Sequence, residues 1–201
     1  MSHPRVEPPP HEAASGTKRG DVHTMRRATS GQVSVHIDAS PEQVYAFVSD
    51  VTKMGQWSPE TRRCKWIRGD GPAVGARFKG YNRRGRARWS NTLEVIAADP
   101  GVEFAFRRAV LHCGVCDWRY RMEPDAGGTT LTESYEVSKP DWAITNWFNG
   151  LVLGVEDRDT DLTEGMRTTL ARIKDTAEKE GAAQRRRDTP GMSDSNPEVR
   201  Q

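Results

Sequence analysis

The sequence lacks the features that would send it into or across a membrane. No apolar stretch follows the basic residues near the start, so no secretory signal is predicted. The most apolar run, Trp142 to Val155, is interrupted by Thr145, Asn146 and Asn149, and it is too short and polar to span a bilayer. The chain has only three cysteines, and an odd count without a signal is typical of reduced thiols. We therefore expect a cytoplasmic protein.

The sequence also lacks the motifs of several enzyme classes. It has no glycine-rich phosphate loop and no serine in a nucleophile-elbow pattern. The segment His112–Cys116 suggests metal or redox chemistry, but Cys113 and Cys116 would point to opposite faces of a strand. A haem-attachment motif needs a histidine after the second cysteine, where this chain has Asp117. We expect structural cysteines, no metal site and no cofactor.

Large apolar side chains are scarce at both ends. Residues 1–30 are rich in proline and glycine, and residues 181–201 begin with an arginine cluster followed by proline, glycine, serine and aspartate. Such segments bury too little apolar surface to offset the entropy lost on ordering. We predict disordered tails at 1–30 and 181–201 around one folded domain at 31–180, which is large enough for a single core.

Hydrophobic periodicity predicts an α+β domain. Val33, Val35 and Ile37 alternate with polar residues, and a Ser40–Gln43 capping box then opens a short helical connector that runs to about Trp57. From 62 to 138 the apolar period is two, which predicts six more strands in an antiparallel meander with one apolar face. The turns are predicted at Gly69–Pro72, Asn82–Gly85, Asp99–Gly101 and Asp125–Gly128.

A long amphipathic helix is predicted after the last strand. Apolar side chains recur every three to four residues from Pro140 onward, and the pattern ends near Gly181. This corresponds to a helix of about 50–60 Å, with Gly150 and Gly154 as the place for any kink. An amphipathic helix that follows a one-faced sheet packs against that sheet.

Several segments resemble one known superfamily. Val33–Asp50, with Trp57 shortly after it, resembles the first strand and helix of the START-like (SRPBCC, helix-grip) superfamily, in particular its bacterial polyketide cyclase/dehydrase and lipid-transport group. Gly75–Phe78, Gly128–Glu133 and Gly165–Lys174 also stand where that group has them. The resemblance implies a helix-grip fold: a curved seven-stranded antiparallel sheet wrapped around a long C-terminal helix, with two short helices after the first strand. It also implies a ligand cavity between sheet and helix.

Strand parity and the helix pattern supply a set of candidate ligand-binding residues. Pockets for small organic ligands are mostly apolar and contain a few convergent polar groups. The alternative is a solid core in which the aromatic side chains fill space and their polar tips bind backbone. The candidate residues are Trp66, Phe78, Trp89, Asn91, Phe104, Phe106, Trp118, Tyr120, Glu133, Tyr135, Phe148 and Leu151.

Glu133 is the candidate for chemistry, because it is the one carboxylate that parity places among apolar side chains. Desolvation would raise its pKa and suit it to general acid or base catalysis of an aldol cyclisation or dehydration. The alternatives are an ion pair with Arg158 from the helix, or a position near the rim.

A basic hairpin is the second candidate surface. Its charges suit anionic phospholipid headgroups or an acidic partner protein. The alternative is that these cations lie on an ordinary solvated sheet face, where the carboxylates of Glu94, Glu103 and Glu136 balance their charge. Nucleic acid is the least favoured partner, because the aromatic residues that would stack on bases are predicted to point inward. The hairpin residues are Arg77, Lys79, Arg83, Arg84, Arg86 and Arg88.

Three functions fit these patterns. The first is a binding or carrier protein for an apolar ligand such as a fatty acid, polyketide or isoprenoid. The second is a polyketide aromatase/cyclase, as the resemblance also implies, and the third is an interaction module that uses the basic hairpin. A ligand cavity would favour the carrier and the cyclase over the interaction module. Convergent polar groups within that cavity would favour the cyclase over the carrier.

Overall fold

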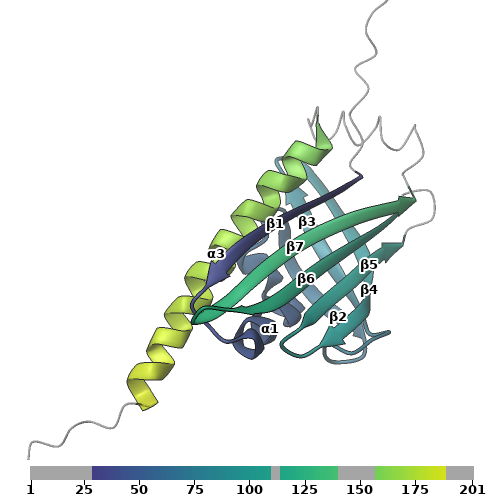
Figure 1. Cartoon of the computed structure of the whole chain (residues 1–201). Coiled ribbons are helices and arrows are strands. Elements are labelled where there is room, and N and C mark those ends of the chain that lie inside the picture. Colours follow the sequence, from purple (N-terminus) through teal and green to yellow (C-terminus); the bar gives the residue numbers. More distant parts are fainter. Residues whose placement is uncertain (1–28, 110–113, 140–156, 189–201) are drawn as a thin grey trace, which may run out of the picture.

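Seven strands in the described part of the chain form one curved antiparallel sheet (Figure 1). The computed structural model describes residues 29–109, 114–139 and 157–188. Strands β2 to β7 form a meander, and β1 pairs with β7 at one edge, which confirms the predicted topology. The strands are β1 (Ser30–Ile37), β2 (Thr61–Arg68), β3 (Arg77–Arg84), β4 (Ala87–Asp99), β5 (Glu103–Ala109), β6 (Val115–Asp125) and β7 (Gly128–Lys139).

Two short helices follow β1, as predicted. In α1 (Pro41–Ser49), the Ser40 hydroxyl accepts from the Gln43 amide at 3.3 Å, and the Gln43 side chain accepts from the Ser40 amide at 3.0 Å. This capping box fixes the start of the helix. The 3-10 helix η1 (Val51–Gln56) follows directly, with the Asp50 carboxylate accepting from the Thr52 amide.

The connection between β2 and β3 is longer than the predicted four-residue turn. Strand β3 begins only at Arg77, and Val74, which fits the alternating pattern, is 69% exposed in the connection. Alternation alone cannot distinguish a strand from an extended loop. The predicted start of this strand was therefore too early.

The hairpin between β3 and β4 is tighter than predicted. Gly85 and Arg86 alone separate the two strands, and Gly85 has a φ of 55°, a left-handed conformation that glycine adopts without steric cost. Arg83 and Arg84, predicted at the turn, are the last residues of β3, where they pair with Arg88 and Ala87. Successive strand residues point to opposite faces, so these two arginines face different surroundings.

Helix α3 (Arg158–Asp188) runs beside β1 and completes the core (Figure 1). Met166 packs with Cys116 and Tyr135 from β6 and β7. Leu170 and Ile173 belong to the main cluster, which also contains the buried face of α1. The helix therefore connects α1 and the inner sheet face. None of the helices in the described ranges combines the length and apolar character needed to cross a bilayer.

The end of α3 differs from the prediction. The helix passes Gly181, where the pattern ended it, and continues to Asp188. An interior glycine costs only about 1 kcal/mol relative to alanine, and the flanking Glu180 and Ala182 favour a helix. The predicted helical segment 140–156, and most of both predicted tails, lie outside the described residues.

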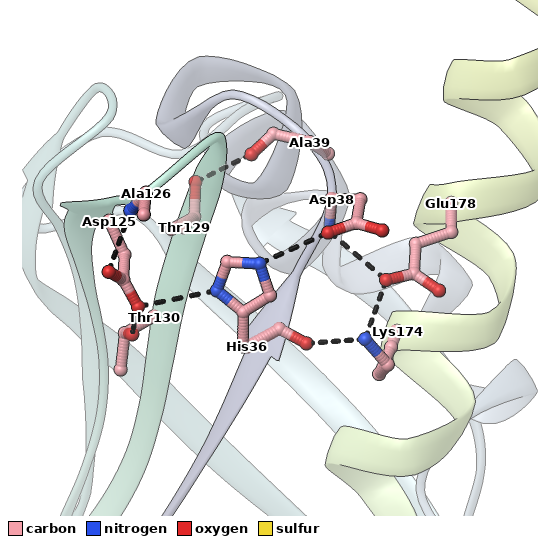
Figure 2. A network of polar contacts seen from close by, with 9 residues as sticks. All are labelled: His36, Asp38, Ala39, Asp125, Ala126, Thr129, Thr130, Lys174 and Glu178. Atoms are coloured by element: carbon pink, nitrogen blue, oxygen red, sulfur yellow. Dashed lines mark hydrogen bonds and ion pairs between the residues drawn. The ribbon is translucent and has the colours of Figure 1, made fainter.

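Polar contacts fasten the second half of α3 to the end of β1 (Figure 2). Lys174 Nζ donates to the His36 carbonyl and to Glu178 Oε1, both at 2.6 Å. Glu178 Oε1 also accepts from the Asp38 amide at 3.0 Å. His36 in turn lies between the carboxylates of Asp38 and Asp125. The network joins α3, β1 and the β6–β7 turn.

We expect Ile173→Ala to lower the free energy of unfolding by about 2–5 kcal/mol, because Ile173 is fully buried where α3 meets the main cluster. Arg167→Ala, on the exposed side of the same helix, is the matched control and should change stability by less than about 0.5 kcal/mol. Urea denaturation measures both. Similar values for the two variants would contradict the packing described for α3.

Candidate functional site

Aromatic side chains form a continuous layer on the inner sheet face. Phe78 and Phe106 lie 5.3 Å apart between ring centroids, and Phe106 continues the layer to Phe104 at 5.9 Å and to Tyr120 at 6.4 Å. These four side chains are buried. Strand parity thus predicted the face on which they lie, and this layer belongs to the hydrophobic core.

Other inner-face residues are only half-buried. Trp66 and Trp118 pack against the main cluster but remain partly exposed. Trp89 and Asn91 on β4 are also partly exposed. Asn91 lies opposite Gly80 of β3, which has no side chain to cover its neighbours. The inner face therefore combines a packed aromatic floor with tryptophan and amide groups that the core does not fully cover. Phe148 and Leu151, the two helix residues of the predicted set, lie outside the described residues.

Glu133 and Tyr120 form a buried polar pair. They lie directly opposite each other on β7 and β6, and the Tyr120 hydroxyl donates to Glu133 Oε1 at 2.9 Å. Glu133 is 4% exposed, which excludes the predicted alternative of a rim position. Its Oε2 atom is buried without a hydrogen-bond partner among the described residues. The other alternative, an ion pair with Arg158, involves a side chain outside the described part.

Burial determines the charge of this pair. Desolvation raises the pKa of Glu133 to about 8, and the hydrogen bond from Tyr120 opposes this shift only in part. Burial and the neighbouring Glu133 likewise raise the pKa of Tyr120 well above its usual value. At neutral pH Glu133 is therefore mostly a neutral carboxylic acid. It accepts from Tyr120 through one oxygen, and its own proton is available to a further acceptor.

Tyr135, another predicted ligand contact, has a structural partner. Its hydroxyl donates at 2.7 Å to Asp159 Oδ1, in the first turn of α3. The same oxygen accepts from the Thr29 amide at 3.2 Å. The Tyr135 hydroxyl thus fixes the start of α3.

Arg84 also binds the start of α3. Its guanidinium donates to both Asp161 oxygens, at 2.7 and 2.6 Å, and to Glu60 at 3.1 Å. Arg84 was predicted as part of the basic hairpin, but it lies on the α3 side of the sheet. Successive strand residues point to opposite faces, so Arg83 points outward and Arg84 inward. Sequence reasoning missed Asp159 and Asp161, although acidic residues in the first turn of a helix are a general sign of N-terminal interactions.

Both described cysteines, Cys64 and Cys116, are buried. Burial raises the pKa of the Cys64 thiol to about 12, so the reactive thiolate is scarce at neutral pH. Cys64 Sγ lies 3.8 Å from Met54 Sδ, within the core. Cys113 and His112 lie outside the described residues. In the described part of the chain, no group of three or more histidine, cysteine, aspartate or glutamate residues is arranged to hold a metal ion.

The family model for polyketide cyclase/dehydrase and lipid transport matches residues 28–178. The chain belongs to this family. The resemblance predicted from the sequence is thereby confirmed, whereas no curated protein matches the chain.

Solved structures show the same fold in distant proteins. The major latex-like protein 151 from Panax ginseng is 12% identical, with a TM-score of 0.56 over 75% of this chain and 99% of its own. The di-domain ARO/CYC BexL from the BE-7585A biosynthetic pathway is 16% identical, with a TM-score of 0.54 over 75% of this chain and 47% of its own. The Polyketide_cyc-like protein Cgl2372 from Corynebacterium glutamicum is 35% identical over 80% of this chain and 92% of its own, with a TM-score of 0.42. The helix-grip fold is therefore shared with the ginseng protein and with BexL.

We expect Glu133 to make stability depend on pH. Below its ordinary pKa of 4.5 the carboxyl is protonated in both folded and unfolded chains, so it carries no penalty. As the pH rises towards about 8, the unfolded chain ionises and the folded one does not, so stability is progressively lost. The loss is at most about 1.4 kcal/mol per pH unit.

Glu133→Gln should remove this dependence, so its stability relative to the native protein should increase between pH 5 and pH 8. Urea denaturation across this range measures the difference. Glu136→Gln, exposed on the same strand, is the matched control, and its stability should depend on pH in the same way as that of the native protein. A constant difference between native protein and Glu133→Gln would show that Glu133 ionises normally in the fold.

Proposed function

We propose that this protein binds an apolar small molecule bearing a carbonyl or hydroxyl group, and holds it between the inner sheet face and α3 as a carrier. The observation that carries this proposal is the buried Glu133 carboxyl, with Tyr120 on one oxygen and no described partner on the other. A buried polar atom without a partner costs stability, and a ligand oxygen beside it would remove that cost. The free, buried Cys64 thiol suits the reducing cytoplasm proposed as its location.

The surrounding side chains support an apolar ligand. The half-buried Trp66 and Trp118 offer wide apolar surfaces next to the packed phenylalanine floor, and Trp89 on β4 is half-buried as well. Sites for small organic ligands combine such surfaces with a few polar groups that set orientation. Lipids, polyketides and isoprenoids all fit this description.

The neutral state of Glu133 favours some ligand groups over others. A protonated carboxyl donates to a ketone or hydroxyl oxygen. An ionised fatty-acid carboxylate would instead leave a second charge beside a desolvated acid, which disfavours it at pH values where Glu133 begins to ionise. We therefore place ketones and alcohols ahead of fatty acids in the binding preference.

Binding can be tested with a neutral apolar dye and two competitors of equal chain length, a long-chain methyl ketone and the corresponding fatty acid. The ketone should displace the dye more strongly at pH 8. Glu133→Leu should weaken ketone binding about 5- to 10-fold, which corresponds to one lost hydrogen bond. Glu136→Leu on the outer side of β7 should leave it unchanged.

Native mass spectrometry of the purified protein complements this test by detecting a bound apolar compound. A native protein that carries no such compound and binds neither dye nor ketone would refute the carrier function. Preference for the fatty acid would refute the role assigned to Glu133.

A second function, polyketide cyclisation, is favoured by the pKa of about 8 at Glu133. A carboxyl with such a pKa can both give and take a proton near neutral pH. In an aldol closure, Glu133 would protonate the ketone oxygen as the enol carbon attacks, while the enol proton leaves to solvent. The Glu133 carboxylate would then remove the α-proton, and the new hydroxyl would leave as water by taking a proton from solvent, which replaces the enol proton released before. The structural likeness to BexL, named as an ARO/CYC, is in line with this candidate.

Glu133→Gln separates the two functions. Glutamine keeps the shape and a hydrogen-bond donor, so ketone binding should persist. If the protein is a cyclase, cyclisation of a synthetic poly-β-ketone chain should fall about 100- to 10,000-fold in this variant. Equal rates for the native protein and Glu133→Gln would remove Glu133 from catalysis. Absence of turnover in a native protein that still binds the ketone would favour the carrier.

A further inference from the structure

The outer sheet face opposite the candidate site carries an array of cations, which we call the basic face: Arg63, Lys65, Lys79, Arg83 and Arg88. It differs from the basic hairpin seen in the sequence. Arg84 turns to Asp161, and Arg77 is paired with Glu94 at 2.7 Å. Strand β2 instead contributes Arg63 and Lys65, which the register places beside β3.

The register brings like charges directly together. Lys65 lies opposite Lys79, and Arg83 lies opposite Arg88. Like charges at opposed positions on neighbouring strands destabilise a sheet. No carboxylate among the described residues forms an ion pair with any member of the basic face. Repulsion within the basic face therefore lowers the stability of the fold, and binding of an anionic partner would remove that repulsion.

Tyr81 lies within this array. The Arg63 guanidinium is 4.4 Å from the Tyr81 ring centroid, and Lys79 Nζ is 5.5 Å from it. Cation–π contacts hold both charges near the ring and fix their positions. Because Arg63 stacks on the Tyr81 ring, it competes with a base for that ring face, which disfavours single-stranded nucleic acid as the partner.

Exposed aliphatic side chains stand in the chain segment that joins two strands of the basic face, β2 and β3. Ile67, near the end of β2, is 48% exposed, and Val74, in the connection to β3, is 69% exposed. A polyanion bound by charge alone would use the cations and not the aliphatic groups. A bilayer interface uses both, since cations bind anionic headgroups and apolar side chains enter the acyl boundary.

We propose that the basic face, together with Ile67 and Val74, docks the protein on an anionic phospholipid membrane. The surface is built on three paired strands, so its charges are held at fixed spacing. Docking through the outer face leaves Glu133 and α3 on the opposite side of the sheet. The interaction therefore does not depend on which ligand the inner face binds.

Sedimentation with vesicles tests the proposal. The full chain should bind phosphatidylcholine vesicles that contain phosphatidylglycerol, and bind pure phosphatidylcholine only weakly. Binding should fall steeply between about 0.01 M and about 0.15 M salt, as the screening length shortens from about 30 Å to about 8 Å. Salt-independent binding, or equal binding to neutral vesicles, would overturn the proposal.

Charge reversal locates the surface. Lys65→Glu, Lys79→Glu and Arg88→Glu combined should lower the vesicle partition coefficient more than about 100-fold, since each cation near the surface is worth about 1 kcal/mol. The same three positions changed to Gln provide a milder variant, with a smaller loss, should the reversal impair folding. The matched control reverses three exposed cations elsewhere, Lys139, Arg167 and Arg187, and should retain binding.

The aliphatic flank has its own variant, Ile67→Ser with Val74→Ser, which should weaken binding while leaving its salt dependence intact. A loss in the control equal to that in the charge-reversed variant would overturn the proposal. So would association with poly-glutamate or single-stranded RNA without association with anionic vesicles, which would assign the basic face to another class of polyanion.

Discussion

Two carboxylates in the first turn of α3 bind groups from strands far apart in the sheet. Asp159 accepts from Tyr135 of β7, and Asp161 accepts from Arg84 of β3. Both carboxylates lie at the positive end of the helix, where negative charge is favoured. Because the two bonds reach strands on either side of β4, β5 and β6, the start of α3 is held over the inner face. The position of the first turns of α3, where Met166 packs in one cluster with Trp118 and Tyr135, depends on this pair of contacts.

The buried Glu133 carboxyl lowers the stability of the fold but offers a polar group for binding or catalysis. A leucine would fit the pattern of the strand without desolvation cost, yet the chain keeps an acid whose second oxygen has no partner among the described residues. The Tyr120 hydroxyl satisfies one oxygen and orients the group. Structures tolerate such a group when it serves binding or catalysis, and a strongly perturbed pKa is a common mark of those sites.

Much of the fold could be predicted from the sequence because it follows local rules. Alternation with period two gave the seven strands and placed Glu133 inside, and the Ser40–Gln43 box gave the start of α1. Contacts between distant segments could not be predicted in this way. The bond from Arg84 to Asp161 depends on the exact end of β3, and a shift of one residue would have exchanged the roles of Arg83 and Arg84. The basic face likewise required the register that sets Lys65 beside Lys79.

Within this sheet, β1 is the first strand that the ribosome makes, and its only partner, β7, is the last. Ser30 pairs with Glu136 and Ile37 pairs with Thr129, so β1 has no neighbour in the sheet until β7 has been synthesised. The residues of α3 that pack against β1 emerge later still. A nascent chain must therefore keep β1, with its apolar Val33, Val35 and Ile37, unpaired until β7 is made, a condition under which aggregation competes with folding. Such pairing between distant segments also slows folding, because the loop must close before the contacts form. The order of the strands thus makes this domain one that completes its folding only after β7 and α3 have been translated.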